Sequence, residues 1–243
     1  MRLIFLGTSH GVPEKHRHCS CALVECGANR YFVDMGMQAI DELITRDMAP
    51  DSVKGIFLTH LHGDHIDGLL SFVDLANWYF RTVDAAIFFP HERGIQALNG
   101  WFSTLQMAMR PMDFRVIQPG VIFEDGVLRV TACRTQHCDF SYSFLLEEVA
   151  TGKKILFTGD LRSPDVDFPL PLLAERPQIV VCETAHFDAA LYEPILKDSG
   201  TEKIIFNHYG IQYGRSGVPL IQALAKKLDI PVVIALDGTE AIL

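Results

Sequence analysis

The segment Thr59-His-Leu-His-Gly-Asp-His65 places three imidazoles and one carboxylate within the six residues from His60 to His65. It directly follows the apolar run Gly55–Leu58, which predicts a buried strand that ends at this cluster. Burying so many polar groups is costly unless each finds a partner, and a bound cation is a partner for all of them. Zinc, manganese and iron(II) accept this mixture of imidazole and carboxylate ligands. One histidine alone indicates an ordinary surface or core residue, but four ligands at alternating positions indicate a metal site, and we expect two metals.

Other polar residues occupy the same position relative to predicted strands elsewhere in the chain. They directly follow apolar runs and are Asp34, the pair Gly159-Asp160, Glu183 and the pair Asn207-His208. A lone Gly-Asp pair is typical of a turn. Repeated polar groups at strand ends indicate instead one shared rim, where loops carry chemistry on a rigid scaffold.

Apolar runs rich in Val, Ile and Phe predict strands. They lie at Leu3–Leu6, Ala22–Val24, Tyr31–Val33, Gly55–Leu58, Ala85–Phe89, Leu128–Thr131, Tyr142–Leu146, Ile155–Phe157, Ile179–Val181, Ile204–Phe206 and Val232–Ala235. Helical periodicity predicts helices over Ala39–Arg46, Leu69–Tyr79, Ile95–Met109, Ala189–Leu196 and Leu220–Leu228. This order suits two packed sheets with helices on their outer faces, an α/β arrangement. No linker, repeat or low-complexity tract occurs, so we expect residues 1–243 to form one domain.

Composition limits the class of protein. The chain has 243 residues, of which 49% are hydrophobic, which is enough for a globular protein with a sizeable core. No apolar run reaches the ~20 residues of a membrane-spanning helix, and the start lacks the core of a signal peptide. We therefore expect a cytoplasmic protein with no membrane partner. The formal net charge of −9 repels polyanions and disfavours a dedicated nucleic-acid binder.

Three of the six cysteines lie close together near the start of the chain, at Cys19, Cys21 and Cys26. With His16 and His18 beside them, they raise the alternative of a second, structural zinc. The chain has no Cys-x-x-Cys pair, however, and Cys21 and Cys26 flank a predicted strand. Reduced thiols that are buried or idle are therefore the favoured interpretation.

The chain resembles the metallo-β-lactamase superfamily over essentially its whole length. The superfamily signature His-x-His-x-Asp-His corresponds to His60, His62, Asp64 and His65. Three further matches follow in the expected order: His137, Gly159-Asp160 and His208. The resemblance implies a four-layer αββα sandwich with a dinuclear metal site at one edge of its two sheets.

The resemblance also divides the ligands between two divalent ions, expected to be zinc, with manganese or iron as alternatives. One ion is held by His60, His62 and His137, and the other by Asp64, His65 and His208. Asp160 would bridge them, since a shared carboxylate and a bridging hydroxide offset the repulsion between cations about 4 Å apart. That hydroxide is the expected nucleophile. We place Asp64 among the catalytic residues as well, and Asp34 is a candidate for orienting a ligating histidine, with a purely structural role as the alternative.

The residue at the bridging position separates branches of the superfamily. True β-lactamases usually carry cysteine where this chain has Asp160, and they are exported, so antibiotic hydrolysis is disfavoured. The segments Phe5–Pro13, with Arg17 and Ser20, Val33–Gly36 and His62–Leu69 resemble the transfer-RNA 3′-processing endonucleases (ribonuclease Z) and related cyclic phosphodiesterases. The Gly- and Pro-rich arm with which ribonuclease Z grips transfer RNA has no evident counterpart. The predicted helix Ile95–Met109 is either simple packing or a lid over the pocket.

Two further residues are candidates for contact with substrate. In the ribonuclease Z branch a histidine downstream of a strand-end glutamate assists the leaving group, and His186 lies near that place, with a shorter spacing from Glu183 than the branch has. It is a candidate general acid, and a satisfied rim histidine is the alternative. Arg215 lies in a glycine-rich segment after His208 and is a candidate phosphate clamp.

We therefore expect a metal-dependent hydrolase, specifically a phosphodiesterase whose substrate is a small phosphodiester such as a cyclic nucleotide or a sugar phosphate. One alternative is a thioesterase or lactonase of the glyoxalase II type. Another is a transfer-RNA endonuclease, which the acidic charge and the missing arm disfavour. A metal-binding protein without activity is least favoured because all seven ligand candidates are present, and a redox role would require a carboxylate in place of one signature histidine. A homodimer is consistent with this branch, although no residue requires one.

Overall fold

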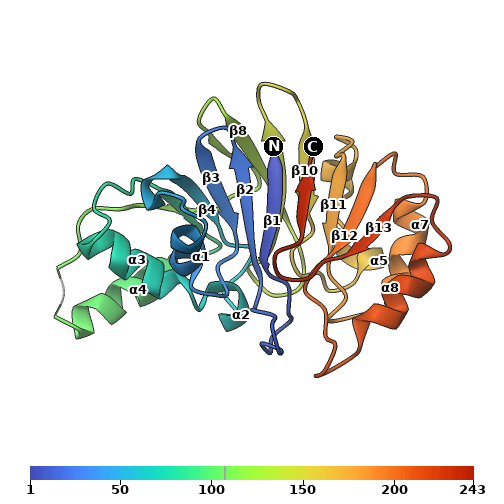
Figure 1. Cartoon of the computed structure of the whole chain (residues 1–243), viewed down its shortest axis with the longest axis horizontal. Coiled ribbons are helices and arrows are strands. Elements are labelled where there is room, and N and C mark those ends of the chain that lie inside the picture. The colour runs from blue at the N-terminus through green and yellow to red at the C-terminus, as the bar shows by residue number, and fades with distance from the viewer. Residues whose placement is uncertain (107) are drawn as a thin grey trace.

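The computed structural model describes residues 1–243 except residue 107. Figure 1 shows two β-sheets packed together at the centre of the molecule, with helices on the outer face of each. Both termini lie at the same end of the molecule, because the first strand pairs with the last. This is the four-layer αββα sandwich expected from the sequence.

Within the described residues, each sheet contains seven strands. In spatial order the first sheet contains β14 (Glu240–Ile242), β1 (Arg2–Gly7), β2 (Cys21–Cys26), β3 (Asn29–Val33), β4 (Val53–Phe57), β5 (Ala86–Phe89) and β6 (Asp113–Val116). The second sheet contains β13 (Val232–Ile234), β12 (Lys203–Phe206), β11 (Ile179–Cys182), β10 (Lys154–Phe157), β9 (Tyr142–Glu148), β8 (Leu128–Arg134) and β7 (Gly120–Glu124).

Each sheet is part antiparallel and part parallel. Strands β3 to β6 are parallel, and so are β10 to β13, whereas β1 to β3 and β7 to β10 pair antiparallel. Neighbouring parallel strands end at the same edge, so residues that follow them are brought together. The polar residues at the strand ends follow parallel strands, or strands that run in the same direction as the parallel strands of their sheet.

The core between the two sheets is built from alternate residues of their strands, since side chains on a strand point to opposite faces in turn. Phe57 lies at its centre and is fully buried. Its ring stacks on Phe88 with 5.1 Å between centroids and contacts Phe123 edge-on at 5.5 Å. Phe144 of the second sheet lies 6.1 Å away. Aromatic rings therefore join the two sheets directly below the edge that carries the polar residues.

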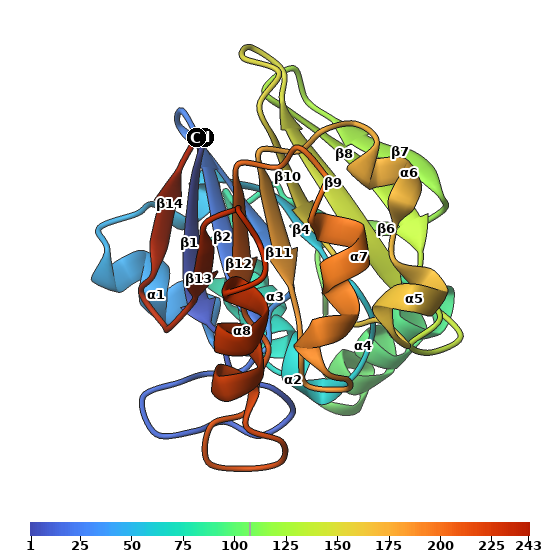
Figure 2. The same cartoon turned by 90° about the vertical axis from the view of Figure 1, so that its right-hand side faces the viewer.

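Helices α1 (Ala39–Thr45), α3 (Leu69–Trp78) and α4 (Glu92–Thr104) cover the outer face of the first sheet. The outer face of the second sheet is covered by α5 (Pro164–Asp167), α6 (Leu170–Leu173), the 3₁₀ turn η2 (Ala189–Tyr192), α7 (Glu193–Leu196) and α8 (Gly217–Ala225), as Figure 2 shows. Two short pieces, η1 (Pro50–Ser52) and α2 (Gly63–Ile66), lie in the connections before and after β4. No helix in the described part of the chain is both long and apolar enough to cross a bilayer.

Several element boundaries differ from the prediction. The helix predicted over Ile95–Met109 begins at Glu92, because His91 caps it, and ends at Thr104; residue 107 lies outside the described residues. The helix predicted over Leu220–Leu228 covers Gly217–Ala225, and Ala189–Leu196 divides into a 3₁₀ turn and one short helix. Strands β6, β7 and β14 were not predicted; β6 and β14 have at most two apolar residues in succession, whereas the apolar run of β7 was missed although it is as long as that of several predicted strands.

We expect Phe57→Ala to lower the free energy of unfolding by about 3–5 kcal/mol, because it removes a ring that contacts both sheets and leaves a cavity. Urea denaturation measures the change. Tyr79→Ala is the matched control, since Tyr79 is 76% exposed, and it should change stability by less than about 0.5 kcal/mol. A loss below about 1 kcal/mol for Phe57→Ala would show that the two sheets do not depend on this cluster.

Candidate metal centre

The candidate site lies at the edge where strands of both sheets end. In the first sheet, β3 and β4 are parallel neighbours, so Asp34 after β3 lies beside Thr59 after β4. In the second sheet, the parallel strands β10, β11 and β12 are followed by Asp160, Glu183 and His208. The predicted rim is therefore present, and it is shared by both sheets.

His137 reaches the same edge although it follows an antiparallel strand. Strand β8 is antiparallel to β9, and β9 is antiparallel to β10, so β8 runs in the same direction as β10. The carboxyl end of β8 therefore lies at the edge where β10 ends. This places His137 opposite the histidines that follow β4.

Backbone contacts join the two sheets at this edge. The amide of Tyr142 donates a hydrogen bond of 2.9 Å to the carbonyl of Thr59. Gly159 packs against the same contact with a φ of +59°, a left-handed conformation that favours glycine. A Cβ atom there would lie 2.6 Å from the Tyr142 carbonyl oxygen. Glycine at this position therefore lets Asp160 approach the histidines of the other sheet.

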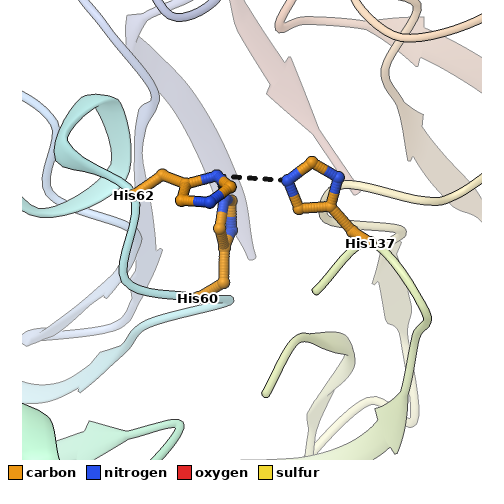
Figure 3. Close-up of side chains that lie close together, drawn as sticks. All are labelled: His60, His62 and His137. Carbon is orange, nitrogen blue, oxygen red and sulfur yellow. Dashed lines mark hydrogen bonds between the residues drawn. The ribbon is translucent and has the colours of Figure 1, made fainter. Parts of the chain in front are cut away.

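Three histidines form the first ligand group, and Figure 3 shows their imidazoles turned toward one another. His60 and His62 come from the segment after β4, and His137 comes from the loop after β8 in the opposite sheet. His62 Nδ1 lies 2.9 Å from His60 Nε2 and 3.2 Å from His137 Nε2. One nitrogen of each ring thus faces a common point.

Asp64, His65 and His208 form the second group. His65 Nε2 lies 3.5 Å from Asp64 Oδ2, and His208 Nε2 lies 3.7 Å from the same oxygen. Asp64 and His65 sit on the short helix α2, which begins after His62, so one turn separates the two groups along the chain. The structure therefore brings together all six of the residues predicted to hold the two ions separately.

Asp160 lies between these two groups. Its Oδ2 is 3.8 Å from His60 Nε2 and 3.7 Å from His137 Nε2 on one side. On the other side, Oδ2 is 3.3 Å from His208 Nε2, and Oδ1 is 3.5 Å from His65 Nε2. A carboxylate in contact with histidines of both groups has the position that a bridging ligand needs.

Asp34 contacts His65 on the side of the imidazole that faces away from the site. Its Oδ2 lies 2.7 Å from His65 Nδ1, while its Oδ1 accepts hydrogen bonds of 2.7 and 2.9 Å from the amide and hydroxyl of Thr59. A carboxylate can only accept here, so Nδ1 of His65 carries the hydrogen and Nε2 faces the site. The orienting role, rather than the purely structural alternative, fits these contacts.

The buried charges of the site compensate one another. Burial opposes charge on His65, but the carboxylates of Asp160 and Asp34 outweigh it and raise the pKa of His65 well above its usual range. Burial likewise opposes charge on Asp160, but His208 and His65 hold the pKa of Asp160 well below its usual range. His60 has the opposite balance, because burial and the neighbouring His65 lower its pKa far enough to keep the ring neutral. A neutral imidazole is the form that ligates a metal.

The residues present fit divalent metal ions. Nε2 of His65 is buried and has no hydrogen-bond partner among the described residues, although it points at Asp64 and Asp160. A buried nitrogen without a hydrogen-bond partner is costly, and a metal ion that displaces the proton from Nε2 would supply a partner. Imidazole nitrogens and carboxylate oxygens in two adjacent groups are a donor set typical of zinc, manganese or iron.

His186 lies at the rim, as predicted, and contacts a residue of the site. Its Nδ1 is 3.0 Å from Glu183 and 3.8 Å from Asp160 Oδ2. Burial favours the neutral ring, but the hydrogen bond and charge of Glu183 outweigh it and raise the pKa of His186 to about 9. The side chain is 37% exposed, so it is accessible from solvent.

Sequence reasoning did not predict a buried ion pair that braces the wall beside His208. Arg17 donates to Glu14 at 2.6 Å and to the carbonyls of Thr8 and Tyr209 at 2.6 and 2.9 Å. Glu14 in turn accepts hydrogen bonds from the three backbone amides of residues 211–213. The pair thus ties the loop after β1 to the loop after His208. Two opposite charges three residues apart, inside a Gly- and Pro-containing loop, were the only signal of it in the sequence.

Arg215 and the cysteines lie outside the two ligand groups. Arg215 is exposed in the loop before α8, and its role as a phosphate clamp stays a prediction. Cys19, Cys21 and Cys26 are buried, and burial raises the pKa of Cys19 to about 11. None of the three belongs to a metal-compatible cluster of the described residues.

Comparison with known proteins agrees with this geometry. The model of the family described as "Anti-Pycsar protein Apyc1" matches residues 1–210. The chain is also 30% identical over 154 residues to ribonuclease Z of Nitrosopumilus maritimus, a match that covers 61% of this chain and 50% of the relative. The chain thus spans about half the length of the curated relatives it matches.

Solved structures share the fold. The metallo-β-lactamase fold protein YhfI of Bacillus subtilis superposes with a TM-score of 0.79 over 99% of both chains, at 19% sequence identity. A diphosphatase of the PhnP family superposes with a TM-score of 0.71, covering 100% of this chain and 97% of the other, at 14% identity. The predicted superfamily, and its ribonuclease Z and phosphodiesterase-like branch, are confirmed.

We expect Asp34→Asn to weaken metal binding by about 10- to 100-fold. Asparagine can keep the hydrogen bonds from Thr59 but turns an NH₂ group toward His65, so Nδ1 must accept and Nε2 becomes protonated. Chelator competition followed by elemental analysis measures the affinity. Circular dichroism should show an intact fold, and wild-type affinity in a folded variant would mean that Asp34 does not set the tautomer of His65.

Proposed function

This chain belongs to the family of the anti-Pycsar protein Apyc1, and on that premise we propose that it is a metal-dependent hydrolase of a small phosphodiester. The observation that carries the proposal is the position of Asp160, which contacts histidines of two adjacent ligand groups. The relatives named ribonuclease and diphosphatase bear the names of enzymes that cleave bonds to phosphorus. The position of Asp160 favours a pair of ions, and the names of the relatives favour phosphoryl chemistry at them.

In this proposal His60, His62 and His137 hold one zinc ion, and Asp64, His65 and His208 hold the other, with Asp160 shared between them. Bound at these ligands, two divalent ions would supply Lewis-acid stabilisation of the phosphoryl charge and lower the pKa of the attacking water. The chain itself keeps the ligands oriented through Asp34. It also balances the charge of the centre, because Asp160 and Asp64 are carboxylates whereas the ligating imidazoles are neutral when they bind metal.

His186 is placed to give a proton to the leaving oxygen. Glu183 accepts from Nδ1 at 3.0 Å, which leaves Nε2 as the nitrogen that can transfer a proton. The ring also lies 4.6 Å, centroid to centroid, from that of His137, so it borders the space between the two groups. General-acid catalysis by His186 is therefore part of the proposal.

A precursor transfer RNA is the second candidate substrate, because the curated relatives are named ribonuclease Z. The formal charge of −9 opposes it, since an acidic protein repels a polyanion. A thioester or lactone is the third candidate. The centre would then polarise a carbonyl, and with a thioester a general acid would matter less, because a thiolate leaves more readily than an alkoxide.

A panel of substrates tests the proposal on protein of measured metal content. We expect turnover of bis-p-nitrophenyl phosphate and of a cyclic nucleotide to exceed that of S-lactoylglutathione and of a precursor transfer RNA. Preferred cleavage of the thioester would contradict phosphodiester chemistry. Preferred cleavage of the transfer RNA would support phosphodiester hydrolysis but contradict the proposal that the substrate is small.

We expect Asp160→Ala to lower the metal content and to abolish hydrolysis together, because it removes the contact between the two ligand groups. Elemental analysis and the phosphodiester assay measure the two effects on the same sample. Asp229→Ala changes an exposed aspartate outside the two ligand groups and is the matched control. It should alter neither the metal content nor the rate of hydrolysis. Full activity after Asp160→Ala would refute the bridging role.

We expect His186→Ala to reduce turnover by about 10²- to 10⁴-fold while the metal content stays unchanged. Added imidazole should restore part of the activity, since the site of the lost side chain is accessible to solvent. Substrates with a good leaving group, such as p-nitrophenolate, should be affected least. Loss of metal in this variant would mean that His186 is a ligand instead of an acid.

A further inference from the structure

Asp167 is a buried carboxylate near the first ligand group that takes no part in the chemistry proposed above. It is the last residue of helix α5 and is 9% exposed. Its Oδ2 accepts hydrogen bonds of 2.6 and 3.0 Å from the backbone amides of Gln136 and Arg162. Its Oδ1 accepts one of 3.1 Å from the amide of Ser163. Three backbone donors thus satisfy a carboxylate that would be costly to bury alone.

The three amides belong to the two loops that carry His137 and Asp160. Gln136 directly precedes His137, after β8, and the other two amides lie two and three residues after Asp160, beyond β10. Strand β9 lies between β8 and β10 in the sheet, so side chains make the link between the two loops. Asp167 is one such link, and the hydroxyl of Thr135, which donates to the Asp160 carbonyl at 3.1 Å, is another. Asp167 therefore helps to fix His137 relative to Asp160.

Glu14 has the same relation to the loop that follows His208. Its Oε1 accepts hydrogen bonds of 2.8, 2.7 and 3.1 Å from the amides of residues 211–213, and its Oε2 pairs with Arg17 at 2.6 Å. The guanidinium of Arg17 lies 4.1 Å from the ring centroid of Tyr209. Burial opposes charge on Glu14, but the three amides and Arg17 outweigh it and lower the pKa of Glu14. A charged, buried carboxylate thus holds this loop as well.

His208 needs such support because its backbone is strained. Its φ is +50°, a left-handed conformation that is uncommon for residues other than glycine. Strained residues persist only where their surroundings hold them in place. The next residue, Tyr209, is held by Arg17 through its carbonyl, at 2.9 Å, and by its own hydroxyl, which donates to the carbonyl of Ala235 at 2.7 Å. Glu14 fixes Arg17 and the rest of the loop.

We propose that Asp167 and Glu14 are positioning residues that serve the two ligand groups separately. Asp167 sets the position of His137 in the first group, and Glu14 sets that of His208 in the second. Neither carboxylate belongs to a metal-compatible cluster of the described residues, so each acts through the backbone of a loop. A ligand that is already ordered costs less free energy when the ion binds, so each carboxylate controls the affinity for one ion. This inference rests on the proposed division of the ligands between two ions.

The proposal predicts opposite changes in one ratio, that of the zinc affinities of the two ligand groups. Zinc titration of the whole chain in chelator buffers measures both affinities. Anomalous scattering from crystals loaded with one equivalent of zinc shows which group is filled first. We expect Asp167→Ala to weaken the first group about 10- to 100-fold relative to the second, and Glu14→Ala to weaken the second by a similar factor relative to the first. A general loss of stability would weaken both groups alike and leave the ratio unchanged.

Two further variants keep the test decisive if an alanine variant does not fold. Asp167→Asn keeps an oxygen acceptor for two of the three amides, so it should shift the ratio in the same direction as Asp167→Ala, by a smaller factor. Glu14→Ala leaves Arg17 buried without its partner, and the double variant Glu14→Ala/Arg17→Met removes both charges. It should shift the ratio as Glu14→Ala does.

Asp165→Ala is the matched control, because it removes an exposed carboxylate from the same helix as Asp167. It should change neither affinity. An unchanged ratio in folded variants of Asp167 and Glu14, or a shift in the same direction in both, would overturn the proposal.

Wild-type protein that binds fewer than two ions would contradict the proposed function, and crystal structures of the metal-free variants then decide the positioning roles. We expect the imidazole of His137 to move by about 1 Å or more in Asp167→Ala while His208 stays in place. In Glu14→Ala we expect the reverse. Imidazoles that keep their wild-type positions in both variants would overturn the proposal.

Discussion

The packing of the two sheets against each other determines everything that the candidate centre can do. Its ligands come from both sheets, so their distances depend on how closely the sheets approach at one edge. Aromatic rings around Phe57 set that approach in the core, and the hydrogen bond from Tyr142 to Thr59 sets it at the edge. Gly159 then lets Asp160 enter the gap, because a side chain at residue 159 would collide with the carbonyl oxygen of Tyr142 in its own sheet and crowd Thr59 of the other sheet. A metal centre built this way is as rigid as the core below it.

A rigid, buried centre also buries charged groups, which is costly, and contacts among those same groups reduce the cost. Asp160 and Asp34 are buried carboxylates, and a buried carboxylate without partners would be unstable. Each is placed against His65. The two carboxylates raise the pKa of His65, and His65 helps to lower the pKa of Asp160, so these buried groups stabilise one another's charges. Metal ions at the same ligands would replace protons as the compensating charges. The protein can therefore form the centre before metal binds, since the groups that will hold the ions already satisfy one another in part.

The sequence predicted which residues gather at the candidate centre better than the boundaries of the elements that carry them, for a physical reason. His60, His62, Asp64 and His65 are adjacent and share one chemistry, so their spacing is informative without any knowledge of long-range contacts. Strands such as β6 and β14 have few apolar residues and exist because a neighbouring strand offers them hydrogen bonds. The ion pair of Glu14 and Arg17 was not predicted either, because the backbone groups of residues 209–213 that it contacts lie almost 200 residues away in the sequence. Asp34 was found because it ends a strand, yet only the fold shows which histidine it orients.

The residues that would contact a substrate differ from the candidate metal ligands in where they lie and in how freely they can change. The candidate metal ligands follow buried strands and leave little freedom for change, since a shift of one residue would move a side chain out of the centre. The cavity beside His62, in contrast, is lined by His91, which caps α4, and by Cys138–Phe140 of the loop after His137, where exchange of a side chain costs little stability. Chains with the same ligand pattern can therefore act on different substrates. The ligand signature therefore indicates the chemistry but not the substrate. The residues that line the cavity beside His62 are the more informative ones to compare among relatives.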